Sequence, residues 1–403
     1  MKNNWQTKKL GEVCDFFADG NWIESKDQSQ EGIRLIQTGN IGDGFFKDRG
    51  EKARYISEKT FRRLRCTEIF AGDILISRLP DPVGRACIVP ETDEKMITAV
   101  DCSILRLKKT FLAYFFNYFS QSNSYLDSVE RETTGTTRKR ISRKNLGLIE
   151  IPVPPIEKQK RIVHIVDEVF EKIEKVKANS EKNLQNSKDL FESYLQSVFA
   201  YPGEDWGESK LKEIGISQTG TTPKTVEKEN YGDFIPFIKP ADVDFSGVGD
   251  IRYDHDGLSE VGLKRGRKME KGSILMVCIG ATIGKVGFAE KLVSCNQQIN
   301  SLTVKEDFEP KFIYYAMTSK EFQNRVLSEG KGAQATLPII NKTKWESLTI
   351  RYPIPKTEQK SIVAKLDALS EQTKKLEGIY KQKLADLEEL KKSVLKQAFK
   401  GEL

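Results

Sequence analysis

The sequence predicts an α+β fold in which two mixed α/β globular parts, related by a pseudo-two-fold axis, are joined by two long antiparallel coiled-coil helices. Three observations predict it: the chain repeats itself, each copy ends in a stretch with heptad periodicity, and prolines precede both of these stretches. With 403 residues, 38% hydrophobic side chains and 29 glycines, the composition is that of a globular protein of two or three domains. It excludes a collagen, a disordered tail and a small disulfide scaffold.

The internal repeat is clearest in the second part of each copy. Identical residues recur 200 positions later, as in the pairs Ile162 and Ile362, Val163 and Val363, Asp167 and Asp367, Leu190 and Leu390, and Phe199 and Phe399. The motif Pro155-x-x-x-Gln159-Lys160 recurs as Pro355-x-x-x-Gln359-Lys360. Upstream of this motif the offset drifts, because Phe111–Tyr114 matches Phe312–Tyr315. Each half is therefore a divergent globular part followed by a more similar tail.

Both tails have the heptad periodicity of long helices. In the second tail, the a and d positions are Leu366, Leu369, Thr373, Leu376, Tyr380, Leu387, Leu390 and Val394. In the first tail, they are Val166, Val169, Ile173, Val176, Leu190 and Tyr194, interrupted by Ser180, Asn183 and Ser187. Polar residues at such positions reduce stability but fix the register of pairing. If the tails pack by these positions, the helices are antiparallel, and a helix from about residue 157 to 199 spans about 65 Å.

Prolines mark the start of each tail. Pro152, Pro154 and Pro155 precede the first, and Pro353 and Pro355 precede the second. Proline is tolerated in the first turn of a helix but not in its interior, so each helix is expected to begin directly after these positions. We therefore expect globular domains at residues 1–155 and 201–355, and helical spacers at residues 156–200 and 356–403.

Short runs rich in β-branched residues predict strands in both globular parts. In the first part, the predicted strands are Ile33–Ile36, Ile74–Ser77, Ala86–Val89 and Ile104–Leu107. In the second part, they are Ile235–Ile238, Ile274–Cys278, Val286–Ala289 and Leu302–Val304. Two segments with aromatic faces, Phe111–Phe119 and Pro310–Leu327, predict helices. Each half is thus expected to be an α+β domain around a mixed sheet.

Several classes of function are excluded by motifs that the sequence lacks. It has no G-x-S-x-G elbow, no H-E-x-x-H helix, no glycine-rich dinucleotide fingerprint and no Asn-Pro-Pro-Tyr or Asp-Pro-Pro-Tyr segment. The six cysteines lie far apart and the only histidines are His164 and His255, so neither a zinc site nor a disulfide framework is expected. We expect a protein that is not an enzyme and that binds no metal.

Hydropathy and charge limit the choice of partner. No run of 18 or more uncharged apolar residues is present, and the N-terminus lacks the apolar segment of a signal peptide. We therefore expect a soluble, cytoplasmic protein with no membrane contact. The net charge of +7 is too small to identify the partner.

A glycine-rich turn, Gly280–Val286, differs from a phosphate-binding loop in two respects. It has three residues between its glycines instead of four, and Val286 stands where a magnesium-binding hydroxyl is required. Its counterpart in the first half, Pro80–Arg85, keeps only the last glycine and the following base. The shared feature is a tight turn carrying Arg85 or Lys285, which is either a solvated cation or a contact to a phosphate.

The densest basic cluster flanks a hydroxyl-rich loop, Thr133–Thr137. Its cations are Arg131, Arg138, Lys139, Arg140, Arg143 and Lys144, with Glu132 as the one acid. Amides, hydroxyls and guanidinium groups in such a loop can bind phosphates and guanine edges, although a solvated surface is the alternative. The equivalent stretch of the second half is Gly330–Lys344. A further cluster occurs only in the second half, at Lys264, Arg265, Arg267, Lys268 and Lys271.

Two divergent halves, each closed by Pro-x-x-x-Gln-Lys-x-Ile-Val and a long helix, resemble the DNA-specificity (S) subunit of type I restriction-modification systems. The resemblance covers essentially the whole chain, and the turn Gly280–Val286 and the segment Gly135-Thr136-Thr137 are also similar to segments of that family. It implies that the globular parts are target-recognition domains, each reading one half of an asymmetric bipartite DNA target. It also implies that the paired helices set the gap between the two halves.

The resemblance further implies partners. These are double-stranded DNA, two modification subunits that bind S-adenosylmethionine and methylate adenine, and a restriction subunit with ATP- and Mg²⁺-dependent translocase and nuclease activity that can join the assembly. No cofactor is expected in this chain itself.

Candidate DNA contacts follow from the loops and the resemblance. In the first domain they are Thr136, Thr137, Arg138, Lys139 and Arg140, and in the second domain they are Lys331, Gln334 and Thr336. Arg85 and Lys285 are the candidate phosphate contacts. Family members often carry a Gly-Thr segment in both domains, and Gly332–Thr336 departs from it. Two alternatives stay open: a coiled-coil adaptor that binds proteins without recognising DNA, and a nuclease or methyltransferase with an unrecognised site.

Overall fold

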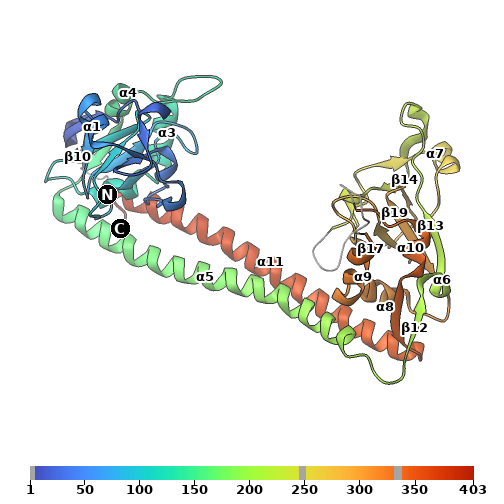
Figure 1. The fold of residues 1–403 in the computed structure, drawn as a ribbon. Coiled ribbons are helices and arrows are strands. Elements are labelled where there is room, and N and C mark those ends of the chain that lie inside the picture. Colours follow the sequence, from blue (N-terminus) through green and yellow to red (C-terminus); the bar gives the residue numbers. More distant parts are fainter. Residues whose placement is uncertain (1–4, 245–250, 331–337) are drawn as a thin grey trace. The chain divides into compact units, whose positions relative to one another are not determined.

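The structure, a computed structural model, describes residues 5–244, 251–330 and 338–403. Its contacts divide the chain into two compact units. Unit 1 comprises residues 1–180 and 382–403, and unit 2 comprises residues 181–381. Each unit therefore contains one globular part and a stretch of both long helices, α5 (Ile156–Ala200) and α11 (Lys356–Lys400) (Figure 1). Among the described helices, none is both long and apolar enough to cross a membrane.

The globular part of unit 1 combines short strands with short helices. Its strands are β1 (Gln6–Lys9), β2 (Cys14–Asp19), β3 (Gln28–Ser29), β4 (Ile33–Ile36), β5 (Tyr55–Ile56), β6 (Glu68–Ile69), β7 (Ile74–Ser77), β8 (Ala86–Ile88), β9 (Met96–Thr98), β10 (Cys102–Leu107) and β11 (Glu150–Val153). Its α-helices are α1 (Glu58–Leu64), α2 (Ala113–Phe119), α3 (Asn123–Arg131) and α4 (Arg143–Leu148).

The globular part of unit 2 is built in the same way. Its strands are β12 (Trp206–Lys210), β13 (Gly215–Thr219), β14 (Tyr231–Ile238), β15 (Gly257–Leu258), β16 (Ile274–Val277), β17 (Val286–Phe288), β18 (Ser294–Cys295), β19 (Ile299–Val304) and β20 (Thr349–Pro353). Its α-helices are α6 (Leu211–Ile214), α7 (Glu260–Arg265), α8 (Pro310–Thr318), α9 (Lys320–Gly330) and α10 (Lys342–Ser347).

Each unit contains a four-stranded antiparallel sheet of the same topology. The strand order is β2-β10-β7-β8 in unit 1 and β13-β19-β16-β17 in unit 2. The register also agrees, because Leu105 pairs with Ile74 in one sheet and Leu302 pairs with Ile274 in the other. Smaller sheets add parallel pairs, β4 with β9 and β14 with β18. The prediction of α+β domains around mixed sheets is confirmed.

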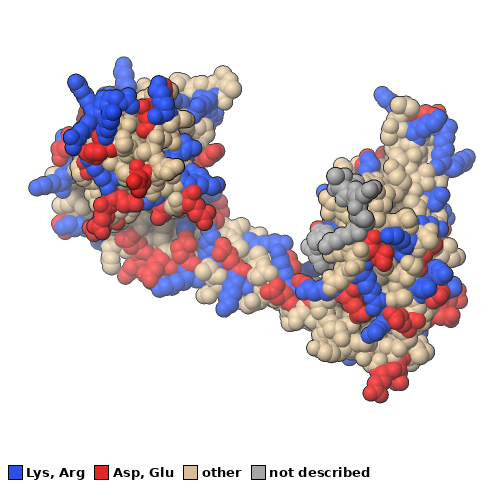
Figure 2. Space-filling model, viewed as in Figure 1, with Lys and Arg blue, Asp and Glu red and all other residues tan. Residues whose placement is uncertain are grey.

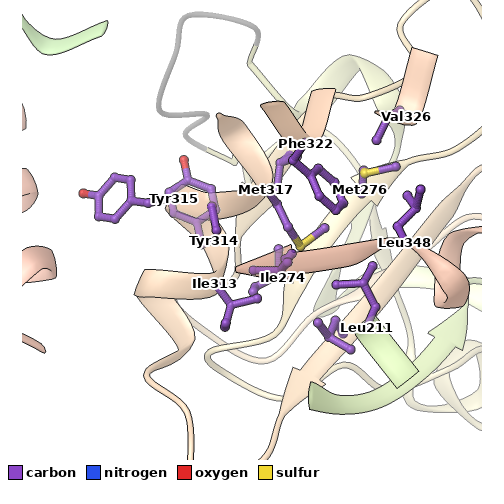
Figure 3. Packing of buried hydrophobic residues seen from close by; sticks show 14 of the residues in the cluster. Leu211, Ile274, Met276, Ile313, Tyr314, Tyr315, Met317, Phe322, Val326 and Leu348 are labelled. Atoms are coloured by element: carbon purple, nitrogen blue, oxygen red, sulfur yellow. The ribbon is translucent and has the colours of Figure 1, made fainter. Parts of the chain in front are cut away.

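The central strand of each sheet is buried on both faces. In unit 2, Ile274 and Met276 of β16 contact the apolar cluster that includes Met317 of α8, whereas Leu275 and Val277 belong to a second cluster (Figure 3). Alternate residues of a strand point to opposite faces, so one strand serves two cores. The helix predicted at Pro310–Leu327 is instead two helices. Ser319 breaks it, because its hydroxyl donates to the carbonyl of Ala316 and accepts from the N–H of Phe322.

A buried glutamine joins each long helix to its globular part. In unit 1, Gln159 accepts a hydrogen bond from the N–H of Leu112 at 2.8 Å and donates to a proline carbonyl ahead of α5 at 2.8 Å. In unit 2, Gln359 accepts from the N–H of Glu309 at 2.8 Å and donates to a proline carbonyl ahead of α11 at 2.8 Å. Both glutamines are completely buried. These bonds give the repeated Pro-x-x-x-Gln-Lys motif a structural reason.

The end of the other long helix packs on the same globular part. In unit 1, the ring of Phe399 at the end of α11 meets Phe115 edge-on, with centroids 5.3 Å apart. In unit 2, the ring of Phe199 at the end of α5 lies 5.4 Å from that of Phe312. Each globular core is therefore completed by the start of one long helix and the end of the other.

The two long helices are antiparallel where they pair. In unit 1, Lys177 of α5 bonds to Glu388 of α11 at 2.7 Å, and Glu174, one turn earlier in α5, pairs with Lys391, one turn later in α11. The expected core positions include Leu190 and Leu390, but these side chains are 52% and 46% exposed. That expectation was wrong for one of the two heptad positions. The buried residues recur every seven positions, as at Thr373, Leu387 and Val394, whereas the residues three positions further on, such as Leu376 and Leu390, lie at the edge of the contact.

The aromatic helices α2 and α8 do not align as the match of Phe111–Tyr114 with Phe312–Tyr315 predicted. Leu112 and Glu309 are equivalent, because each precedes its helix and bonds to the buried glutamine. Tyr118 of α2 therefore corresponds to Tyr315 of α8, and not Tyr114 as the sequence match suggested. Each of these tyrosines donates to the matching aspartate of a long helix, Asp167 or Asp367.

We predict that Gln359→Ala lowers the free energy of unfolding by about 2 kcal/mol, because it leaves a buried N–H and a buried carbonyl unpaired. Chemical denaturation followed by tryptophan fluorescence measures this change. Gln382→Ala, at an exposed position of the same helix, is the control and is expected to stay within about 0.5 kcal/mol. Equal effects of the two substitutions would contradict a role for Gln359 in joining helix and domain.

Candidate nucleic-acid interface

One edge of the four-stranded sheet of unit 1 gathers several of the candidate side chains. Because the strands are antiparallel, β2 and β7 end at the edge where β10 begins. Asp19 ends β2, Arg78 follows β7 and Asp101 precedes β10. The N–H of Arg78 donates to the carbonyl of Asp101 at 2.9 Å, and the N–H of Ile141 donates to the carbonyl of Arg78 at 3.3 Å. We refer to Asp19, Arg78, Asp101 and residues 133–143 as the unit 1 edge.

Asp101 holds two arginines of the basic loop. Its carboxylate lies 2.9 Å from Nη2 of Arg140 and 3.8 Å from Nη2 of Arg138. Both guanidinium groups still face solvent over much of their surface. Asp101 itself is a residue that the sequence reasoning missed, because a lone carboxylate in a turn carries no signal of its partners.

Asp19 holds a buried arginine at the same edge. Its Oδ2 lies 3.4 Å from Nη1 of Arg78 and 3.9 Å from Nε of Arg143, and its Oδ1 accepts from the hydroxyl of Ser103 at 3.1 Å. Burial lowers the pKa of the Arg78 guanidinium, while the charge of Asp19 acts in the opposite direction. The Nε of Arg78 is buried without a hydrogen-bond partner among the described residues. Such a donor is costly unless a bound group or water accepts from it.

The loop that carries the candidate contacts is closed at its base. Thr134 and Arg140 exchange two backbone hydrogen bonds of 2.9 and 2.8 Å. Gly135 has a φ of +101°, and a Cβ there would lie 2.5 Å from the carbonyl oxygen of Arg138, so the turn requires glycine. The predicted residues Thr136, Thr137, Arg138 and Lys139 are exposed, and Arg140 is partly buried. The structure brings these five residues together on one loop, and their contact with DNA stays a prediction.

The surroundings of the unit 1 edge are also basic. Figure 2 shows Lys and Arg side chains gathered over α1 and α4 of unit 1. The exposed cations of these helices are Lys59, Arg62 and Arg63 of α1 and Arg143 and Lys144 of α4. Within the edge itself, four guanidinium groups (Arg78, Arg138, Arg140 and Arg143) and the ammonium of Lys139 stand against the carboxylates of Asp19 and Asp101, which leaves a net charge of +3.

Arg85 has a different place from the one expected of a phosphate contact. Its side chain is folded back onto its own domain, and the residue is only 8% exposed. Its guanidinium donates to the backbone carbonyls of five residues, namely Thr38, Ile41, Leu79, Pro80 and Pro82. Because these bonds hold the buried guanidinium inside its own domain, Arg85 fixes the turn after β7 and does not extend toward the surface.

The equivalent edge of unit 2 carries one cation where the structure describes it, Lys342 at the position of Arg143. The N–H of Cys278 donates to the carbonyl of Gln298 at 2.8 Å, and the N–H of Ile340 donates to the carbonyl of Cys278 at 2.9 Å. These bonds match those of the unit 1 edge, so Cys278 replaces Arg78 and Gln298 replaces Asp101. At the position of Asp19 and Ser103, unit 2 has Thr219, whose hydroxyl donates to Asn300 at 2.8 Å.

The remaining candidates lie in unit 2. Lys285 is partly buried, and its Nζ donates to the carbonyl of Val243 at 3.0 Å. Lys331, Gln334 and Thr336 lie outside the described residues. In the basic cluster before β16, Arg265 pairs with Glu227 and Glu229, while Arg267 donates to the carbonyl of Thr219 at 2.8 Å.

Two glycines set the position of both edges and were missed in the sequence. A Cβ on Gly20, directly after β2, would lie 2.2 Å from the carbonyl oxygen of Ala99. A Cβ on Gly220, directly after β13, would lie 2.1 Å from that of Asn296. The two glycines are 200 positions apart, so the repeat itself could have identified them.

The cysteine thiols of both units are free, and five of the six are buried. Burial raises the pKa of Cys87, Cys102, Cys278 and Cys295 to about 12, so these thiols stay neutral at physiological pH. Within residues 5–244, 251–330 and 338–403, no group of three or more His, Cys, Asp or Glu side chains is arranged to hold a metal ion.

Two units with the same sheet topology but different edge chemistry define a protein built on an internal repeat. The model of the family described as the type I restriction modification DNA specificity domain matches residues 2–184 and 203–388. The chain therefore belongs to the type I restriction-modification DNA specificity family.

Individual relatives agree with this family. The putative type I restriction enzyme MjaX specificity subunit of Methanocaldococcus jannaschii is 22% identical over 431 aligned positions, covering 100% of this chain and 94% of the relative. The type I restriction enzyme EcoKI specificity subunit of Escherichia coli strain K12 is 24% identical over 323 positions, covering 75% and 68%.

Solved structures show the same fold. A chain from a type I R-M system, solved to describe its complex assembly and conformational transition, matches with a TM-score of 0.79 at 20% identity, covering 100% of both chains. The HsdS subunit from Thermoanaerobacter tengcongensis matches with a TM-score of 0.60 at 18% identity, covering 99% of this chain and 97% of that one.

We predict that Gly20→Ala lowers the free energy of unfolding by about 1–3 kcal/mol, because its Cβ overlaps a backbone oxygen that cannot move aside cheaply. Chemical denaturation measures the effect. Gly50→Ala in the same unit is the matched control, since a Cβ there meets no atom within 4 Å. A Gly20→Ala protein as stable as the control would show that the turn after β2 is not fixed by this contact.

Proposed function

We propose that this chain is the sequence-specific DNA-binding subunit of a type I restriction-modification complex, and that each globular part reads one half of an asymmetric bipartite target. The observation that carries the proposal is the difference between the two edges on equivalent sheets. Unit 1 exposes three arginines, Arg138, Arg140 and Arg143, beside two carboxylates. The described part of the unit 2 edge has one cation, Lys342, with the uncharged Thr219, Gln298 and Asn300. Guanidinium and amide groups favour different bases, so the two halves are expected to read different sequences.

The long helices are proposed to set the gap between the two half-targets. Each is an unbroken α-helix of 45 residues, and a helix of that length spans about 68 Å. The antiparallel ion pairs Lys177–Glu388 and Glu174–Lys391 support a fixed register. Two readers on one duplex must match its helical repeat of about 34 Å per turn, which a stiff pair of helices can enforce.

Exposed apolar side chains on the helices support docking of modification subunits. Val176 and Leu390 are partly exposed in unit 1, and their equivalents 200 positions away, Leu376 and Leu190, are partly exposed in unit 2. Equivalent patches suit two copies of the same partner. These partners would bind S-adenosylmethionine and methylate adenine, and a restriction subunit that uses ATP and Mg²⁺ could join them. This chain would itself carry out no catalysis.

The first test concerns the basic loop. Replacing Arg138 and Arg140 together by alanine is expected to weaken target binding by about 1–3 kcal/mol and to relax preference at one base pair, because a bidentate contact to guanine is lost. Competition binding to target and mutated duplexes measures both effects.

The control is Arg62→Ala with Arg63→Ala, which removes the same charge from α1. A loss that is uniform across sequences would identify Arg138 and Arg140 as phosphate contacts. DNA binding that is absent from the unaltered complex, with partner binding intact, would leave the protein adaptor as the function.

The second test concerns the helices. Deleting residues 179–185 together with 380–386 removes one heptad from each helix and is expected to shorten the target gap by about 3 base pairs, since seven residues span about 10 Å. A methylation map of DNA from cells that express the complex measures the gap. Deleting only residues 179–185 misaligns the core positions of the two helices and is expected to abolish methylation. A gap unchanged by the matched deletion would refute the proposed spacing.

A further inference from the structure

We infer that Asp101 is a positioning residue for base recognition: it holds Arg140, with Arg138 beside it, so that the free side of the guanidinium meets the O6 and N7 atoms of a guanine in the first half-target. The inference rests on the proposed DNA-reading function and names the base and the residue through which the arginine acts.

The geometry of the pair leaves the required donors available. Asp101 engages one N–H of Arg140 Nη2 at 2.9 Å. The second N–H of Nη2 and the N–H beside it on the other side of the guanidinium form a parallel pair of donors that can meet two acceptors of one base. The side chain of Arg140 remains 43% exposed, and that of Asp101 is 25% exposed. A guanidinium carries five donors in a planar fork, so it can bind a carboxylate on one side and two guanine acceptors on another.

The backbone fixes the carboxylate in place. Asp101 lies in the turn before β10, where its carbonyl accepts from the N–H of Arg78 and the N–H of Cys102 donates to the carbonyl of Ala99 at 2.9 Å. Arg140 is held by its two backbone bonds with Thr134. A side chain restrained at both ends loses less conformational freedom on binding than a free arginine does, so the ion pair favours one docking geometry.

A purely electrostatic role for this edge would not need Asp101. Its negative charge opposes the approach of phosphates, so a surface built only for backbone binding would be stronger without it. A carboxylate retained among four arginines therefore favours orientation over charge. In unit 2, Gln298 stands at the position of Asp101, and Ile339 stands at the position of Arg140. The contact to guanine is therefore expected only in the first half-target.

The experiment uses the full chain assembled with its methyltransferase partner and duplexes that carry 7-deazaguanine, which lacks the N7 acceptor, at each guanine of the first half-target in turn. With the natural chain, one such position is expected to lower affinity by about tenfold. With Asp101→Asn, that sensitivity is expected to disappear, while affinity for random duplex rises and its dependence on salt steepens, because one negative charge is gone.

The matched control is Glu130→Gln. It removes the carboxylate that lies 3.1 Å from Nζ of Lys139 in the same region, with the same change of charge. The cation that it frees is an ammonium group and not the guanidinium of an arginine. It is expected to strengthen target and random binding equally and to keep the sensitivity to 7-deazaguanine. If Asp101→Asn behaves like this control, the proposed role of Asp101 is overturned.

A loss of stability in the variant and a failure of the proposed function give different results. Where Asp101→Asn unfolds at lower temperature, Arg140→Lys replaces it: this variant keeps the charge and loses the fork, and retained discrimination at the sensitive guanine would overturn the inference. If the natural complex does not distinguish any target from random duplex, the proposed function fails before Asp101 is reached.

Discussion

The buried amide that joins each long helix to its globular part is the contact on which the architecture depends. Gln159 and Gln359 pair with an N–H and a carbonyl that would otherwise be buried without partners. A helix cannot swivel at its first turn without breaking these bonds, so each sheet keeps a set orientation to the helix that follows it. Because the same bonds occur in both units, each edge stands in the same relation to the helix that follows its own sheet.

The two units share the same four-stranded sheet but differ in the residues at its edge, and the positions of the buried residues explain why. The central strands β7 and β16 are apolar on both faces and pair in identical register, so their packing leaves little room for change. The next residue after each strand is also buried, but it differs in chemistry: it is Arg78, paired with Asp19, in one unit and Cys278 in the other. Sequence can therefore diverge at the rim while the sheet that presents the rim stays the same.

Much of the frame could be predicted because it is periodic. Prolines, heptads and the 200-residue repeat indicated both long helices and two related mixed sheets. The side-chain positions at the edges could not be predicted, because the sequence does not show whether a basic residue in a turn faces solvent or folds back onto its own domain. Arg85 donates to five backbone carbonyls and Arg140 leans on Asp101, yet both follow a short loop. Leu190 was misplaced for a related reason: periodicity marks an apolar stripe but not its width.

The completion of one core by residues from the far end of the chain has a consequence during synthesis. Val394, Leu395 and Ala398 are buried in the core of unit 1, and Phe399 packs against it. A ribosome releases the first globular part long before it makes these residues, so the apolar surface that they cover stays exposed until residues 394–399 have been synthesised. A premature stop codon before residue 394 would thus leave the core of the N-terminal domain incomplete.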